Sequence, residues 1–269
     1  MSTYLHGHHE SVLRSHRWRT VANSAAYLQP HLSPGMKVLD VGCGPGTITR
    51  DLATLVSPGG SVVGIDNAED IVVVAARAIE GLVAATSMDV TFKVADLYAL
   101  EYDDDTFDVV HAHQVLQHLS DPVAALREMS RVTKPGGLVA ARDADYAAMT
   151  WHPANPGLAA WLTLYEALAR RTGGEPDAGR RLRQWGVDAG MNDITSSASV
   201  WCFASDHDRQ WWGGLQADRT TQSAFADQAL ASGLATDSEL QQIAAAWRQW
   251  ATDDRSWFAV VHGEILCRV

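Results

Sequence analysis

Short apolar runs alternate with helical patterns between residues 36 and 146. The runs MKVLDVG, SVVGID, DVTFKVAD, FDVVHAH and LVAARD have the length and the β-branched content of buried strands. Between them, residues 47–56, 68–83 and 122–132 repeat apolar side chains at helical intervals, although the three valines of the second segment favour a strand locally. Strands and helices that alternate at this spacing predict βαβ units, right-handed crossovers and a parallel sheet.

The pattern changes after residue 146. AAMTWHPANPG, with two prolines, predicts an irregular loop, and helical patterns follow over residues 157–171 and 178–189. ITSSASVWCFA alternates like a strand, and residues 206–252 are helical with a break at SGLATD. SWFAVVHGEILCRV predicts a closing strand, which brings the predicted strands to a total of seven.

The chain divides into three predicted regions. Residues 1–35 form a helical cap that ends at HLSPGMK, and residues 36–146 form the alternating core. Residues 147–269 add helices on the substrate side and the last two strands of the same sheet. A chain of 269 residues is within the reach of one elaborated α/β domain.

Composition and charge narrow the function classes. The formal net charge is −11 and no basic stripe is present, which argues against a nucleic-acid partner and suits a neutral or cationic small ligand. Cys43, Cys202 and Cys267 are far apart and form no CxxC, so neither a disulfide framework nor a zinc site is expected. The sequence has no apolar leader and no run of about 18 apolar residues. We expect a cytoplasmic protein, monomeric or homodimeric, without a membrane partner.

The stretch VLDVGCGPGTIT, residues 38–49, is the most specific in the chain. A buried strand ends at Asp40, and Gly42, Gly44 and Gly46 precede a helix. Glycines allow a tight turn and let a ligand approach the backbone, which suits NAD, FAD, ATP and S-adenosylmethionine alike. The Asp40 carboxylate would repel a pyrophosphate and suit the ammonium of a methionine group. The loop has neither the G-x-G-x-x-G spacing nor the Lys-Ser/Thr pair of a P-loop.

Acidic residues also follow the next two strands. Asp66 ends the second strand, where a carboxylate accepts hydrogen bonds from both hydroxyls of a ribose, and Asn67 is included in the same site. Asp96 is placed to accept from an adenine amino group, beside Ala95 and the backbone N–H and apolar side chain of Leu97. For each aspartate alone, the alternative is a helix N-cap. Together they predict a cofactor site that holds no phosphate.

In their order, these motifs resemble class I S-adenosylmethionine-dependent methyltransferases. VLDVGCGPG, GID, VADL, FDVVHAHQVLQHLSDP and RVTKPGGLVAARD carry the resemblance over residues 36–145, and they are most similar to the group of the ubiquinone and menaquinone biosynthesis methyltransferases. HGHHESVLRSHRWRTVANSAAYL and EPDAGRRLRQWGVDAGM are similar to actinobacterial small-molecule members. The resemblance implies S-adenosylmethionine as cofactor and an α/β, Rossmann-like sheet of seven mostly parallel strands, the last antiparallel. It also implies an N-terminal helical cap and helical insertions on the substrate side.

The stretch HAHQVLQHL, residues 111–119, contains three histidines. Alternation places His111 within the strand, where a hydrogen-bonded sheet histidine is expected, and His113 with Gln114 at the carboxyl end, where open α/β sheets bind ligands. The resemblance places His113 and Gln114 beside the transferable methyl group, and His118 where it touches the cofactor or braces the loop. The spacing is wrong for a helical metal pair, so no metal is expected. His113 is the first candidate for a catalytic base.

Further candidates lie outside these motifs. Arg19 is expected either to pair with the cofactor carboxylate or to be a solvated helix charge. Tyr4 and His9 are second candidates for the base and for substrate contact, and Tyr146 is expected to orient the substrate or to form a simple turn. Arg180 begins a helix whose dipole favours acids, so it indicates a specific ion pair or an anionic substrate group.

Nine of the ten tryptophans follow residue 150. Four of them are expected in the core, within helices: Trp161, Trp185, Trp247 and Trp250. Four others are candidates for an aromatic substrate pocket: Trp151, Trp201, Trp211 and Trp212. We therefore expect methyl transfer from S-adenosylmethionine to a carbon, nitrogen or oxygen atom of a small aromatic or natural-product acceptor, an indole carbon included. The alternatives are a nicotinamide-dependent oxidoreductase, which Asp40 and the glycine spacing disfavour, and a non-catalytic S-adenosylmethionine-binding partner protein.

Overall fold

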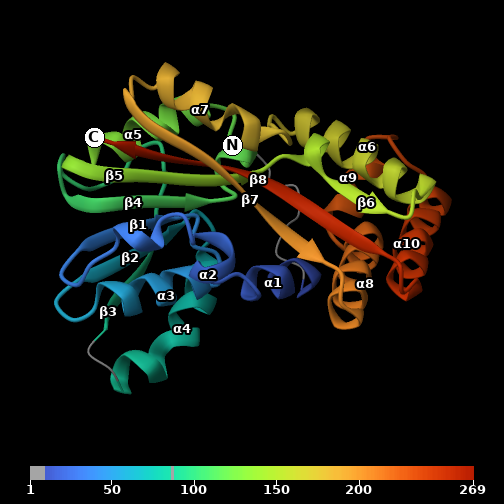
Figure 1. Ribbon diagram of the computed structural model, residues 1–269, viewed down its shortest axis with the longest axis horizontal. Coiled ribbons are helices and arrows are strands. Elements are labelled where there is room, and N and C mark those ends of the chain that lie inside the picture. Colours follow the sequence, from blue (N-terminus) through green and yellow to red (C-terminus); the bar gives the residue numbers. More distant parts are fainter. Residues whose placement is uncertain (1–9, 86–87) are drawn as a thin grey trace.

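The computed structural model describes residues 10–85 and 88–269, and one mixed β-sheet forms its centre (Figure 1). The strands are β1 (Lys37–Val41), β2 (Ser61–Asp66), β3 (Asp89–Val94), β4 (Phe107–His113), β5 (Thr133–Ala144), β6 (Thr150–His152), β7 (Asp193–Phe203) and β8 (Trp257–Arg268). Their order is β3-β2-β1-β4-β5-β8, and β6 and β7 both pair with β8. Neighbours from β3 to β5 are parallel, and β8 is antiparallel to each of its partners. The predicted Rossmann-like sheet with an antiparallel last strand is confirmed.

The described sheet has eight strands, so the prediction of seven was wrong by one. The additional strand is β6, which lies within the segment that was predicted to be an irregular loop. Residues 150–152 pair with residues 257–259 of β8, beyond the stretch of β8 that pairs with β5. β8 extends beyond the end of β5, and β6 pairs with the backbone groups of β8 that β5 does not reach. Pro153 and Pro156 stand just outside β6, and they gave the segment the composition of a loop.

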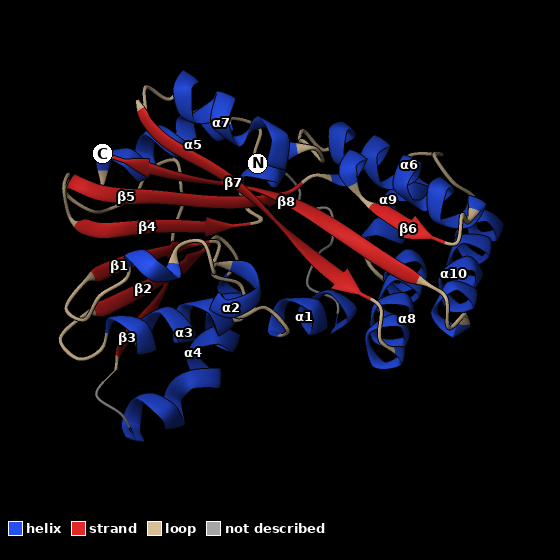
Figure 2. Cartoon of the chain, viewed as in Figure 1, coloured by secondary structure: helices blue, strands red, loops and turns tan. Residues whose placement is uncertain are grey.

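Helices cover both faces of the sheet (Figure 2). They are α1 (Glu10–Arg17), α2 (Val21–Ser24), α3 (Thr47–Val56), α4 (Glu69–Ala85), α5 (Pro122–Arg131), α6 (Pro156–Arg171), α7 (Ala178–Asp188), α8 (Asp206–Gln222), α9 (Ala224–Ala231) and α10 (Asp237–Thr252). Val109 and Val110 show how the two faces are divided, because adjacent strand residues point to opposite sides. Val110 joins Leu126 of α5 and Leu182 of α7, and Val109 joins Leu52 of α3 in a second core.

β7 and β8 continue beyond β5 into a group of helices formed by α6, α8, α9 and α10 (Figure 1). The core between them is aromatic, with Trp247, Trp250 and Phe258 almost completely buried. The ring of Phe258 on β8 lies 5.3 Å from that of Trp247. The core position predicted for these tryptophans is confirmed. The helical stretch over residues 206–252 has one break more than predicted, at Ser223, whose side chain accepts from the backbone of the first turn of α9.

The segment with α1 and α2 lies against β7 and α8. The Trp18 ring packs edge-on against Trp201 with centroids 5.2 Å apart, and the Trp201 indole N–H donates to the carbonyl of Asn23 at 2.5 Å. Arg14 on α1 pairs with Asp218 on α8 at 3.0 Å. These contacts join residues about 180 positions apart in the sequence. They close one side of the space between the parallel part of the sheet and the helices α6, α8, α9 and α10. Within the described ranges, no helix is both long and apolar enough to cross a membrane.

Candidate active site

The loop between β1 and α3 adopts a backbone conformation that favours glycine. Gly42, Gly44 and Gly46 have φ angles of 63°, 53° and 79°, all in the left-handed region. A Cβ atom at Gly42 would overlap Val115, and one at Gly46 would lie 2.6 Å from the Phe92 ring. At Gly44 an added Cβ would meet no atom closer than 3.8 Å, so the backbone of this turn is accessible to a bound group. The loop therefore fits a cofactor that lies along the chain.

Asp40 lies beneath this loop and braces it. Its Oδ1 is 2.8 Å from His111 Nδ1, and its Oδ2 accepts from the Thr49 hydroxyl at 2.6 Å. The register of β1 and β4 sets Asp40 beside His111, so the two side chains meet on one face of the sheet. His111 is fully buried, which confirms it as a hydrogen-bonded sheet histidine. Direct contact between Asp40 and a cofactor stays a prediction, because both of its oxygens have partners within the protein.

Asp66 ends β2 at the mouth of the glycine loop. Its Oδ2 accepts from Gly44 N and its Oδ1 from Ala68 N, both at 3.1 Å, which fixes the carboxylate beside the turn. The Asp66 carbonyl accepts from Ala95 N and ties the ends of β2 and β3 together. Asn67 follows in an exposed position. A carboxylate oxygen accepts more than one hydrogen bond, so this arrangement is compatible with a second acceptor role toward a ribose.

Asp96 and Leu97 reach the same edge of the sheet after β3. Asp96 is exposed, and its Oδ1 accepts from Tyr98 N at 2.9 Å. The Leu97 side chain is buried in the core below, so its backbone N–H and its apolar surface lie at the boundary between core and solvent. Contact of Asp96 and Leu97 with an adenine ring stays a prediction.

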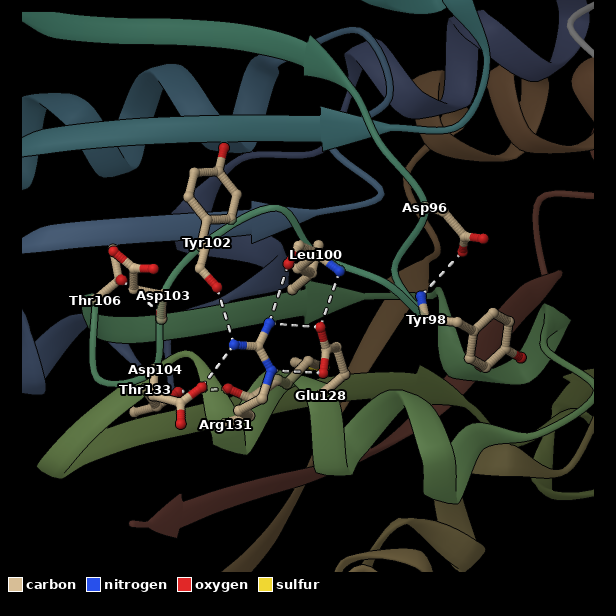
Figure 3. Close-up of polar contacts among 11 residues, drawn as sticks. Asp96, Tyr98, Leu100, Tyr102, Asp103, Asp104, Thr106, Glu128, Arg131 and Thr133 are labelled. Atoms are coloured by element: carbon tan, nitrogen blue, oxygen red, sulfur yellow. Dashed lines mark hydrogen bonds and ion pairs between the residues drawn. The ribbon is translucent and has the colours of Figure 1, made fainter.

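A salt-bridged network holds this segment in place (Figure 3). Arg131 donates to the carbonyl oxygens of Leu100 at 3.0 Å and Tyr102 at 2.9 Å. Glu128 pairs with the same guanidinium at 2.7 Å and accepts from Leu100 N at 2.8 Å. The hydrogen bonds from Arg131 lower the pKa of Glu128, so the pair remains charged at neutral pH. α5 therefore positions the loop that carries Asp96.

A chain of hydrogen bonds fixes the carboxyl end of β4. Gln114 has a φ of 53°, and its N–H donates to the Arg142 carbonyl at 2.7 Å. Arg19 Nη2 donates to Gln114 Oε1 at 2.5 Å, and Gln114 Nε2 donates to His262 Nε2 at 2.8 Å. His262 Nδ1 lies 3.1 Å from the Val260 carbonyl and therefore carries the ring proton. Burial, with the charge of Arg142, holds the pKa of His262 well below its usual value, so the ring is neutral.

A buried acid anchors the turn after β4. Asp143 Oδ1 accepts from Gln117 N at 3.1 Å. The Gln117 amide accepts from Ala144 N at 3.2 Å and donates to His118 Nε2 at 3.0 Å. Burial raises the pKa of Asp143 to about 7, and burial with the charge of Arg19 lowers the pKa of His118 to about 3. His118 is thus an uncharged acceptor that braces the loop, which is one of the two roles expected for it.

A cavity opens between this turn, the end of β5, and helices α1, α6 and α8. Aromatic rings form much of its wall: Trp18, Tyr146, Trp161, Tyr165, Trp201, Trp212 and Phe225. Polar side chains complete it: Ser15, His16, Arg19, Gln114, Gln117, His118, Gln216 and Arg219. Tyr146, Trp201 and Trp212 therefore lie where a substrate pocket was predicted. Trp151 and Trp211 instead stack near Phe258 and Phe203.

Comparison with known proteins decides the class of this site. A family model described as a methyltransferase domain matches residues 32–189, more than half of the chain. The chain belongs to this methyltransferase domain family. A methyltransferase of Schizosaccharomyces pombe, itself described as uncharacterized, is 36% identical over 98% of this chain and 95% of its own length.

A further relative matches part of the chain, and a solved structure shares its fold. Demethylmenaquinone methyltransferase of Shouchella clausii is 36% identical over 44% of this chain and 54% of its own length. The solved structure of phosphoethanolamine N-methyltransferase 2 of Haemonchus contortus, in complex with S-adenosyl-L-methionine, has a TM-score of 0.57 at 17% identity. It covers 95% of this chain and 56% of that one. The predicted enzyme class, an S-adenosylmethionine-dependent methyltransferase, is confirmed, and the resemblance to the menaquinone group holds over part of the chain.

His113 is a buried candidate residue of the methyltransferase. It is 5% exposed, and neither ring nitrogen has a hydrogen-bond partner within residues 10–85 and 88–269. Its ring lies 5.7 Å from that of Trp201 and 6.2 Å from that of His262. Burial, with the charge of Arg19, holds its pKa well below 6.5. His113 is therefore neutral at physiological pH, it is not among the described residues that line the cavity, and its role beside the methyl group stays a prediction.

Trp201, which contributes to the cavity wall, rests on a buried ion pair. Arg142 Nε lies 3.2 Å from Glu264 Oε1 and 2.9 Å from the Ser199 hydroxyl. The guanidinium carbon is 5.0 Å from the centre of the Trp201 ring, within cation–π range. β5, β7 and β8 thus cooperate to orient one wall of the methyltransferase cavity.

Arg180 does not line the cavity. Its guanidinium donates two hydrogen bonds to Asp145, at 2.7 and 2.6 Å. Of the two alternatives expected for Arg180, the structure therefore shows the ion pair. Tyr4 and His9 lie outside the described residues. Within the described ranges, no group of three His, Cys, Asp or Glu side chains is arranged to hold a metal ion.

Four residues near the cavity were missed by the sequence analysis: Gln117, Gln216, Arg219 and His262. His262 and Glu264 are two polar residues on one face of an otherwise apolar closing strand, and this pattern was a usable signal. Gln216 and Arg219 gave no such signal, because polar residues on a helix usually indicate a solvated face.

Proposed function

We propose that this methyltransferase transfers the methyl group of S-adenosylmethionine to a small, flat, mostly apolar acceptor held in the aromatic cavity. One observation carries the proposal. Gln114, Gln117 and His118 line the cavity and belong to the turn that directly follows β4, and β4 is the neighbour of the strand that ends in the glycine loop. An acceptor in the cavity would therefore lie next to the methionine end of a cofactor bound along that loop.

The cofactor side of the proposal follows the sheet edge. The backbone of Gly42 and Gly44 lies along the methionine part, and Asp40 holds the loop from below. Asp66, with Asn67, accepts from the ribose hydroxyls, and the segment of Ala95, Asp96 and Leu97 receives the adenine. Arg19, fixed by Gln114, pairs with the carboxylate of the cofactor. His113 and His118 border the transferable methyl group.

S-adenosylmethionine supplies an electrophilic methyl group when it is bound. The protein has to hold the acceptor in line with the sulfur–methyl bond and to exclude water. Trp201 and Tyr146 suit this task because they are buried, and each is fixed by further contacts: Trp201 to Asn23, and Tyr146 stacked on Tyr165 at 3.9 Å. Aromatic faces also stabilise positive charge that develops on an acceptor such as an indole carbon.

A proton must leave the acceptor during or after transfer. His113 is the candidate to receive it, as a neutral imidazole with an unpartnered nitrogen. Its lowered pKa makes it a weak base, which suits an acceptor that becomes strongly acidic on methylation. An indole carbon or a phenol in the course of attack has this property, and an alkyl alcohol does not.

A mass-spectrometric screen tests the proposed function. The protein is incubated with S-adenosylmethionine and with phenols, indoles and quinone precursors, and products heavier by one methyl group are sought. We expect transfer to members of one flat aromatic class. Binding of NADH in place of S-adenosylhomocysteine, together with no transfer, would contradict the proposal.

The ribose assignment has its own test. We expect Asp66→Ala to weaken the calorimetric affinity for S-adenosylhomocysteine by about tenfold or more, because it removes a charged acceptor of two hydrogen bonds. Asp227→Asn, an exposed position on α9, is the control and should bind like the wild type. An unchanged affinity in Asp66→Ala would refute the assignment.

A further inference from the structure

We propose that the acceptor carries a carboxylate, and that Arg219 and Gln216 of α8 bind it inside the aromatic cavity. The inference rests on the proposed function and narrows its substrate class from a flat aromatic molecule to a flat aromatic anion.

Three residues of α8 face the cavity at helical spacing. Trp212, Gln216 and Arg219 are separated by four and three positions, so they lie in a row on one side of the helix. All three are at most 9% exposed. The row presents an aromatic surface followed by an amide and a guanidinium. This order of groups matches a flat apolar ligand with a polar end.

Arg219 is a permanent charge at a buried position. Its Nη2 donates to the hydroxyl of Ser15 on α1. Arginine stays protonated in proteins, and its planar fork matches a carboxylate. Arg219 lines the same cavity as Tyr146. Burial raises the pKa of Tyr146, and the hydrogen bond with Tyr165 and the charges of Arg219 and Arg19 oppose this rise. The neighbouring acid on the helix, Asp218, faces outward and pairs with Arg14.

Gln216 supplies a second donor. Its side chain is 3% exposed and lines the cavity. An amide offers two N–H donors, which suit the oxygens of a carboxylate. Gln216 lies one turn from Arg219, and the two side chains together can reach both oxygens of one carboxylate.

The charge of the lining supports the same conclusion. The described lining residues include Arg19 and Arg219 and no aspartate or glutamate, although the whole chain has a net charge of −11. In the proposed function Arg19 faces the cofactor carboxylate. Arg219 lies on the acceptor side of the cavity. The expectation of a neutral or cationic ligand came from the average charge of the chain, whereas the cavity itself favours an anion.

The test compares matched ligands that differ only in charge. Calorimetry measures the binding of indole-3-carboxylate and indole-3-carboxamide, and of 4-hydroxybenzoate and 4-hydroxybenzamide, to the full chain saturated with S-adenosylhomocysteine. In the wild type we expect at least one pair in which the carboxylate binds about tenfold or more tightly than the amide, the difference that a charged hydrogen bond supplies. Arg219→Met keeps the length of the side chain and should reduce the ratio to about one.

Two further variants complete the design. Arg171→Met removes a charge at an exposed position of α6 and should keep the wild-type ratio. Gln216→Leu removes the amide without changing the charge, and it should lower the ratio even if Arg219→Met fails to fold. Equal affinities within every pair, no binding of any probe, or a ratio that survives both α8 variants would overturn the inference. Methyl transfer to neutral aromatics without a carboxylate preference would overturn only this inference, whereas failure to bind S-adenosylhomocysteine would overturn the proposed function.

Discussion

Asp143 is the buried group whose charge state should affect stability most visibly. It is completely buried on β5, and burial raises its pKa from 3.8 to about 7, partly opposed by hydrogen bonds from the turn after β4 and by the charges of Arg142 and Arg19. We predict that the stability of Asp143→Asn relative to the wild type increases by about 2–3 kcal/mol between pH 5 and pH 8. The Asn carbonyl oxygen can still accept from Gln117 N, so the turn that lines the cavity should keep its position.

The sign and the size follow from linkage. A carboxyl group whose folded pKa is raised contributes stability at pH values below its unfolded pKa, and that contribution is lost as the pH rises through the folded pKa. The shift from 3.8 to about 7 corresponds to about 4 kcal/mol in total. Between pH 5 and pH 8 the loss is about 2–3 kcal/mol, because the remainder falls below pH 5. Asparagine does not titrate, so the variant escapes this loss.

Urea unfolding at pH 5, 6, 7 and 8 measures the difference between variant and wild type, in which groups that titrate equally in both proteins cancel. Asp227→Asn is the control, since it removes an equal charge from an exposed position. An equal difference in the free energy of unfolding between Asp143→Asn and the wild type at pH 5 and pH 8 would refute the prediction. The same pH dependence in Asp227→Asn would also refute it.

Two further predictions concern the catalytic and glycine-loop residues. His113→Ala should lower kcat by about 100-fold and leave the affinity for S-adenosylhomocysteine near that of the wild type, and wild-type kinetics in this variant would refute the role of His113. Because the pKa of His113 lies well below 6.5, protonation of His113 should cause no loss of kcat in the wild type between pH 8 and pH 6. Gly46→Ala should lower the free energy of unfolding by about 2–4 kcal/mol, because it combines a left-handed φ with an overlap on Phe92. Gly81→Ala, which meets open space within α4, should instead stabilise by roughly 0.5–1 kcal/mol, and equal effects of the two changes in thermal melts would contradict this account.

The cofactor side was largely predictable from the sequence. Asp40, Asp66 and Asp96 each follow an apolar run, and parallel strands bring their carboxyl ends to one edge, so local patterns were enough to place them together. His111 was separated from His113 by strand alternation alone, and its contact with Asp40 bears this out. The missing detail was the use of the Asp40 carboxylate as a brace, which depends on the register between β1 and β4 and on Thr49.

The acceptor side was less predictable because distant segments form it. β6 exists only because β8 outruns β5, a difference in strand length that no local pattern records. Trp161 was expected in the core, and it lies both in the core, where its ring packs edge-on with Trp247, and at the cavity. Trp18 became a wall residue because α1 lies beside α8, a contact between opposite ends of the chain.

The net charge of the chain and the charge inside the cavity predict different ligands. The net charge of −11 is spread over the surface, and solvent and salt screen it within about 10 Å. A guanidinium inside a buried cavity is screened far less by solvent, so we expect Arg219 to influence the choice of ligand more than a single exposed acid does. Replacing Arg219 should therefore change ligand preference more than removing any single surface charge. The matched carboxylate and amide ligands measure that contrast directly.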